Sequence, residues 1–125
     1  MPFNTHDYLD LAKELAGVEG HTGGKEARHR SAISRAYYAV MIYARAEAAR
    51  RGGISFPRRN THAWTIDRWK KDPDPLAKKI GSRLKRLKNR RVMADYDTHV
   101  KNLDKELRSA LKEADELWGW ISELP

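Results

Sequence analysis

Residues 31–49 constrain the fold of this 125-residue chain more than any other segment. Their sequence, SAISRAYYAVMIYARAEAA, lacks glycine and proline and contains seven alanines, the residue with the highest helix propensity. Apolar residues at three- and four-residue spacing form two adjacent stripes that cover more than half of a helix surface. The stripes are Ile33, Tyr37, Val40, Met41 and Ala44, and Ala32, Ala36, Ala39, Tyr43 and Ala46. We therefore expect a central helix surrounded by other elements, with one polar edge formed by Ser34, Tyr38 and Arg45.

Other segments with helical patterns lie on both sides of the central helix. A first helix is predicted to start after Thr5 and to end at Gly17, with Tyr8, Leu11, Ala12 and Leu15 facing the core. Glycine or proline separates the central helix at about residues 24–52, a short helix at 61–71 and a basic helix after Pro75, and a last helix is predicted at about 98–124. There is no alternating strand pattern. The expected architecture is a single all-α domain over residues 1–125, an antiparallel bundle of four principal helices plus one short helix.

The composition excludes several kinds of protein. Hydrophobic residues make up 40% of the chain, but no apolar run approaches twenty residues, and the N-terminus lacks the pattern of a signal peptide. We expect a cytoplasmic protein without a membrane span. The absence of cysteine excludes disulfides and thiolate metal sites. Because His21, His29 and His62 lack partners at ligand spacing, we expect neither a metal nor a cofactor.

The net charge of +8 is concentrated in the predicted basic helix. One interpretation is a solvated, solubilising face. The other, which we favour, is a surface for a polyanion such as the RNA backbone, bound without sequence specificity, because like charges four residues apart destabilise a helix. The cations that form this face without an interleaved acid are Lys78, Lys79, Arg83, Lys85, Arg86, Lys88 and Arg90.

The apolar stripe of the same helix runs into charged residues. Leu76, Ile80, Leu84 and Leu87 continue at four-residue spacing to Arg91 and then to Asp95. One interpretation is a structural i,i+4 ion pair between these two residues. In the other, Arg91 lines a cleft where its planar guanidinium binds a phosphate. Asp95 would then orient Arg91 or accept a hydrogen bond from Tyr96. Ser34, Arg35 and Tyr38 are candidates for the second wall of that cleft. Alternatively, Tyr38 is a core residue whose hydroxyl bonds a neighbouring helix.

Two segments together resemble a known family. Residues 31–39, SAISRAYYA, and residues 91–97, RVMADYD, are similar to the conserved elements of small bacterial HEPN domains. This resemblance implies an all-helical, usually dimeric protein concerned with RNA. Many HEPN domains are metal-independent ribonucleases that act as toxins of toxin–antitoxin pairs or in phage defence. Their active site is an arginine followed, after four to six residues, by a histidine, and both subunits contribute to it.

The chain departs from that active-site motif. A gap of four residues after Arg90 ends on Asp95, and the first histidine after Arg91 is His99, with seven residues between them. The resemblance implies a site made of Arg91, Asp95, Tyr96 and His99, with Tyr96 as the position that a partner nucleotidyltransferase modifies. His99 is either a displaced catalytic base or a solvated residue.

Two functional hypotheses follow. The first is a dimeric, RNA-directed protein, with metal-independent endoribonuclease activity as an open question. The second is a non-catalytic helical module that binds RNA or a partner protein, such as a nucleotidyltransferase antitoxin.

Overall fold

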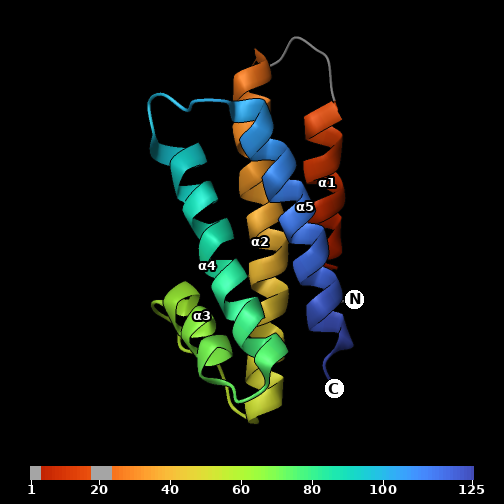
Figure 1. Cartoon of the computed structure of the whole chain (residues 1–125), viewed down its shortest axis with the longest axis vertical. Helices are drawn as coiled ribbons and strands as arrows, with labels where there is room; N and C mark the ends of the chain where they lie inside the picture. Colours follow the sequence, from red (N-terminus) through yellow and green to blue (C-terminus); the bar gives the residue numbers. More distant parts are fainter. Residues whose placement is uncertain (1–3, 18–23) are drawn as a thin grey trace.

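The structure of this protein is a computed structural model that describes residues 4–17 and 24–125. In these ranges the chain is helical, with connecting loops, and follows the order α1 (His6–Gly17), α2 (Gly24–Gly52), α3 (Thr61–Lys71), α4 (Pro75–Tyr96) and α5 (Leu103–Glu123). The four longer helices α1, α2, α4 and α5 run up and down beside one another, and the shorter α3 packs against one end of α4 (Figure 1). This confirms the predicted all-α bundle of four principal helices and one short helix.

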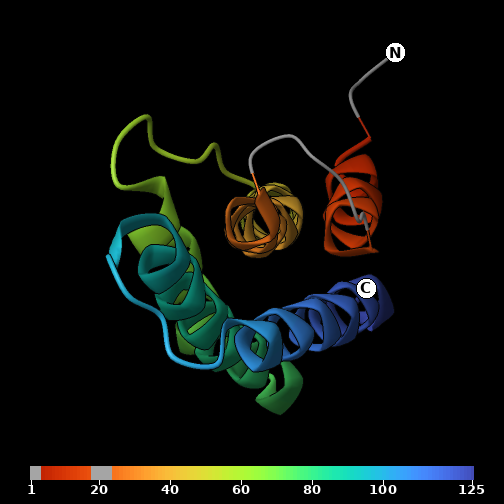
Figure 2. The same ribbon diagram turned by 90° about the horizontal axis from the view of Figure 1, so that it is seen from above.

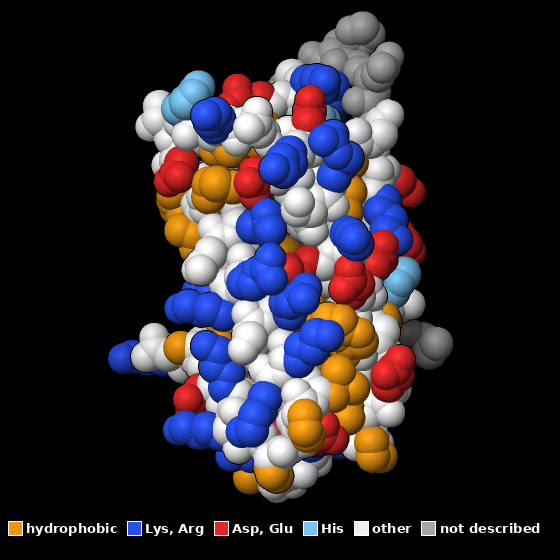
Figure 3. Space-filling model, viewed as in Figure 1, with side chains coloured by type: hydrophobic (Ala, Val, Ile, Leu, Met, Phe, Trp, Pro, Cys, Tyr) orange, Lys and Arg blue, Asp and Glu red, His pale blue; other side chains and the backbone are white. Residues whose placement is uncertain are grey.

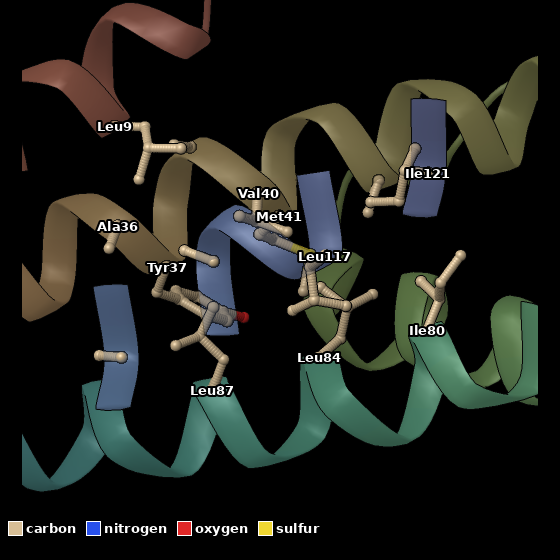
Figure 4. Packing of buried hydrophobic residues seen from close by; sticks show 14 of the residues in the cluster. Leu9, Ala36, Tyr37, Val40, Met41, Ile80, Leu84, Leu87, Leu117 and Ile121 are labelled. Carbon is tan, nitrogen blue, oxygen red and sulfur yellow. The ribbon is translucent and has the colours of Figure 1, made fainter. Parts of the chain in front are cut away.

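Helix α2 lies at the centre of the bundle and contacts each of the other four helices (Figure 2). Its alanine-rich surface is buried, which lets neighbouring backbones approach closely. On the side towards α4, Tyr37 and Met41 point towards Leu84 and Leu87, as Figure 4 shows. The buried residues of this helix include Ala32, Ile33, Ala36, Tyr37, Ala39, Val40, Met41, Ala44 and Ala48.

Two details predicted for the outer helices were wrong. In α1, Ala12 is buried and Tyr8 and Leu15 are half-buried against the core, as predicted, but Leu11 is 38% exposed and Leu9 is buried instead. The helix is rotated so that Leu9 faces the core. The last helix starts at Leu103 instead of Thr98.

The late start of α5 has a local cause. Asn102, the residue before the helix, has a left-handed backbone with φ 56°, and such a residue cannot continue a right-handed helix. The segment 97–102 is therefore a loop that joins α4 to α5, and His99 lies in this loop.

Local signals position the start of α4. Pro75 occupies the first turn, where its missing N–H costs nothing, and the Asp74 carboxylate accepts a hydrogen bond of 2.8 Å from the Leu76 amide. From there Ile80, Leu84 and Leu87 face the core, so that Arg91 comes next on the same side of the helix.

Arg30 of α2 fixes the other end of α4. Its guanidinium donates hydrogen bonds to the carbonyl oxygens of Ala94 at 3.0 Å and Asp97 at 2.6 Å. These carbonyls belong to the last turn of the helix, where they have no partner within the helix and where the dipole favours a cation. The contact ties the segment around Asp95 and Tyr96 to the central helix.

The crossing of α3 over α4 depends on a glycine. A Cβ atom at the buried Gly81 would lie 2.8 Å from the backbone nitrogen of Lys70 and 3.1 Å from the carbonyl oxygen of Ile66, both in α3. The absence of a side chain at this position allows the two backbones to touch. The site described below includes the first turn of α3, so its geometry depends on this contact.

We expect Gly81→Ala to lower the free energy of unfolding by about 1–3 kcal/mol, because the methyl group forces α3 away from α4. The matched control is Gly119→Ala in α5, where nothing lies within 4 Å of the added Cβ. That change should instead raise stability by about 0.5–1 kcal/mol, since alanine is the better helix former. Urea unfolding followed by circular dichroism measures both, and equal stabilities of the two variants would contradict the close approach.

Candidate functional site

Arg91 is held against two aromatic rings of the central helix. Its guanidinium carbon lies 5.3 Å from the ring centroid of Tyr37 and 5.4 Å from that of Tyr38, within the range of cation–π attraction. The side chain is only 11% exposed, and its Nε is buried without a hydrogen-bond partner in the described part of the chain. The cation is therefore fixed in place while part of its donor capacity remains unused.

Asp95 is the carboxylate partner of Arg91. One of its oxygens lies 3.4 Å from Nη1 of Arg91 and 3.4 Å from the hydroxyl of Ser34. Both distances are long for hydrogen bonds, so both interactions are weak. The structure thus brings Ser34 and Tyr38 of α2 together with Arg91 and Asp95 of α4, as the cleft hypothesis expects.

Arg35 does not belong to this group. Its guanidinium faces the ring of Tyr8 in α1, with 5.9 Å to the centroid. Consecutive residues of a helix are rotated by about 100°, so Arg35 points towards α1 while Ser34 points towards α4. The prediction that Arg35 shares the wall with Ser34 and Tyr38 was wrong for this reason.

A cavity of about 440 Å³ opens beside Arg91, between α2, the first turn of α3 and the C-terminal half of α4. No Asp or Glu lines it, and Lys88 forms no ion pair within the described residues. Tyr96, the last residue of α4, is 73% exposed at its edge. The lining residues are Tyr38, Asn60, Thr61, His62, Ala63, Lys88, Arg91 and Tyr96. The cavity therefore carries positive charge and hydrogen-bond donors, which suit an anion.

His62 also lines this cavity, although the sequence led us to consider it only as a metal ligand. Its Nδ1 lies 2.6 Å from the Tyr37 hydroxyl. Burial lowers the pKa of His62, and the nearby cations Arg91, Lys88 and Arg45 lower the pKa further. The imidazole is therefore neutral at pH 7. No spacing in the sequence links position 62 to Arg91, because the two meet only through the packing of α3 on α4.

His99 is exposed and lies apart from Arg91 within one chain. It lines a different cavity, of about 750 Å³, near the start of α5, together with His29 and Asp104. Nδ1 of the buried His29 is 3.0 Å from the Asp104 carboxylate. A contact between His99 and the Arg91 cavity therefore needs a second subunit.

The basic face of α4 is partly neutralised by α5. Arg83, Arg86 and Arg90 lie 3.6–4.0 Å from the carboxylate of the buried Glu113, and Arg90 also pairs with Glu106 at 2.5 Å. No acid is interleaved among these cations within α4, but acids of another helix compensate part of their charge. Burial raises the pKa of Glu113, and the surrounding arginines oppose that shift.

The remaining cations of α4 have different environments. Lys79 and Arg83 lie over the Trp120 ring, at 4.4 and 5.5 Å from its centroid, and the Lys78 ammonium donates to the Lys70 carbonyl oxygen at 3.1 Å. Lys85 is exposed and, like Lys88, has no ion pair within the described ranges. Figure 3 shows Lys and Arg side chains gathered over α4 and the adjoining edge of α5. The cations of α4 that have no acidic partner in α5 therefore include Lys88, which lies at the end of the helix that lines the cavity.

Two further findings concern residues 4–17 and 24–125. No helix there is long and apolar enough to cross a membrane. No group of three or more His, Asp or Glu side chains there is arranged to hold a metal ion.

Comparison with known families agrees with the fold and with the two sequence elements that meet at Arg91. The family model described as the HEPN domain matches residues 24–124, which include α2 to α5. Comparisons with curated proteins and with solved structures found no match. Because the matched segment spans most of the sequence, the resemblance drawn from residues 31–39 and 91–97 is confirmed: the chain belongs to the HEPN domain family.

Proposed function

We propose that this protein is RNA-directed and that it binds the RNA backbone at the cavity beside Arg91. The observation that carries the proposal is the environment of Arg91. Two tyrosine rings hold this cation, its carboxylate partner is weak, and it lies at the wall of a cavity that no Asp or Glu lines. A guanidinium in a fixed orientation suits bidentate binding of a phosphate, and the fixed orientation reduces the entropy lost on binding. Membership of the HEPN family supports an RNA-related role.

The charge of α4 supports the same proposal. Lys85 and Lys88 are cations of this helix without acidic partners in the described ranges, and Lys88 lines the cavity. Phosphate contacts by such lysines attract RNA without reading its sequence and weaken as salt concentration rises. We therefore propose that α4 guides the RNA towards Arg91.

We further propose that residues 1–125 act as one domain, in a homodimer and in the cytoplasm. Val92 supports the dimer, since it is a large apolar side chain, 39% exposed, near the end of α4. The exposure of Tyr96 makes its hydroxyl accessible to a modifying enzyme, which supports a nucleotidyltransferase as a protein partner.

The second candidate function is metal-independent cleavage of RNA, as in a toxin or a phage-defence component. The exposed position of His99 in the α4–α5 loop favours it, because a loop residue at the surface is accessible to a neighbouring subunit. In this scheme the ribose 2′-hydroxyl attacks the adjacent phosphorus, His99 of one subunit takes the proton, and Arg91 of the other stabilises the charge on the phosphorane. The P–O5′ bond then breaks, which leaves a 2′,3′-cyclic phosphate, and the departing 5′-oxygen takes a proton from water.

RNA binding is tested with a fluorescently labelled single-stranded RNA and anisotropy at several salt concentrations. We expect Arg91→Ala to weaken binding about tenfold or more and to reduce the salt dependence by about one phosphate contact. Arg35→Ala removes a cation from the neighbouring helix on the side away from the cavity, and it should bind like the unmodified protein. Equal affinities of the Arg91→Ala and Arg35→Ala variants would overturn the proposed site.

Cleavage is tested by incubating the protein with labelled RNA in EDTA. If the second candidate is right, RNA is cut, and Arg91→Ala and His99→Ala each abolish cutting. Mixing these two inactive variants should then restore part of the activity, because a mixed dimer contains one site with both residues intact. RNA that stays intact while it binds in a salt-dependent manner would exclude cleavage and leave the binding function.

A further inference from the structure

The hydroxyl of Tyr37 determines which nitrogen of His62 carries a proton. Tyr37 is fully buried, and burial raises its pKa, although the Arg91 cation opposes this shift. The hydroxyl therefore keeps its proton at neutral pH. Nδ1 of His62, at 2.6 Å, is its only acceptor in the described parts of the chain. Since a buried O–H without an acceptor is costly, Tyr37 donates to Nδ1.

It follows that the neutral imidazole carries its own proton on Nε2. Nε2 forms no hydrogen bond with the described residues and is not among the buried atoms that lack a partner. The His62 ring lines the cavity, and its Nδ1 side is held by Tyr37. The Nε2–H group is thus an accessible donor in a fixed orientation.

The other residues that line the cavity also suit an anion. Arg91 and Lys88 supply positive charge, and residues of the first turn of α3 line the cavity as well. Asn60, which precedes that turn, has a left-handed backbone with φ 54°, and its side chain does not cap the helix. The amides of this turn therefore remain available as donors. The side chains from α2, α3 and α4 that line the cavity together favour an anion with several acceptor oxygens.

We propose that this cavity seats one phosphate group of RNA and that His62, held by Tyr37, donates a hydrogen bond to a phosphate oxygen through Nε2–H while remaining neutral. This inference rests on the proposed RNA function and adds a binding residue, His62, and a positioning residue, Tyr37. A neutral donor contributes a hydrogen bond without the repulsion that a third cation beside Arg91 and Lys88 would cause.

The charged groups around His62 determine how its pKa responds to a bound phosphate. Burial lowers the pKa of His62 from its ordinary value in the free protein, and the nearby cations Arg91 and Lys88 of α4 and Arg45 of α2 lower it further. Tyr37 and Tyr38 of α2 are the other titratable groups against it. A bound phosphate is negative and stabilises the imidazolium, so binding must raise the pKa of His62.

The first measurement is nitrogen NMR of the histidine side chains of the unmodified protein. We expect a protonated Nε2 and an unprotonated Nδ1 at pH 7, and a rise in the pKa of His62 when a single-stranded RNA hexanucleotide is added. In Tyr37→Phe the preference for this tautomer should disappear. A proton on Nδ1 in the unmodified protein, or a pKa that RNA leaves unchanged, would overturn the inference. Both readouts come from the unmodified protein, so they do not depend on the folding of a variant.

The second measurement compares RNA affinities by anisotropy at pH 7. His62→Leu should bind about three- to tenfold more weakly, the loss expected for one hydrogen bond, and His62→Gln, which keeps an N–H donor, should recover most of it. The control is His6→Leu in α1, which should bind normally. Normal binding by His62→Leu together with weak binding by Arg91→Ala would refute the role of His62 and leave the proposed function standing. Normal binding by both would refute the proposed function as well.

Discussion

The packing of four helices around the apolar faces of α2 positions the candidate site. Ala32, Ala36, Ala39 and Ala44 are fully buried, and α2 contacts every other helix. A helix held on several sides cannot rotate without disturbing the whole core. Its two adjacent tyrosines therefore have fixed directions, with Tyr37 in the core against α4 and Tyr38 at the edge of the cavity. The rings that hold Arg91 thus belong to the central helix of the folded core.

Arg91 shows how the fold balances a charge near its core. Withdrawing a guanidinium from water is costly, and here two ring faces and Asp95 offset part of that cost. At the other cations of α4, the α5 acids Glu106 and Glu113 neutralise much of the charge. Lys88 has no such partner among the described residues. Part of the uncompensated charge of α4 therefore lies where the cavity opens, and this charge attracts a polyanion to that end of the helix.

Local patterns predicted much of the fold and part of the site. Helical spacing and the glycines and prolines indicated α2, α3 and α4, and the break in the apolar stripe of α4 indicated Arg91 and Asp95. The inward direction predicted for Leu11 of α1 and the start predicted for α5 were wrong. They depend on the orientation of one helix against its neighbours and on the left-handed backbone of Asn102, which spacing does not reveal.

Contacts between distant segments were also invisible to the sequence. Arg30 reaches the carbonyls at the end of α4, Glu113 lies among the arginines of α4, and His62 meets Tyr37. Each pair joins residues with no shared periodicity, so only the tertiary packing shows it. The central claim, that RNA backbone lies at this meeting point, is tested most directly by amide NMR of the labelled protein titrated with single-stranded RNA. We expect the largest shifts at Asn60 to Ala63 and at Lys88 to Tyr96. Shifts centred on His29 and Asp104 at the other cavity, with the first turn of α3 unchanged, would contradict it.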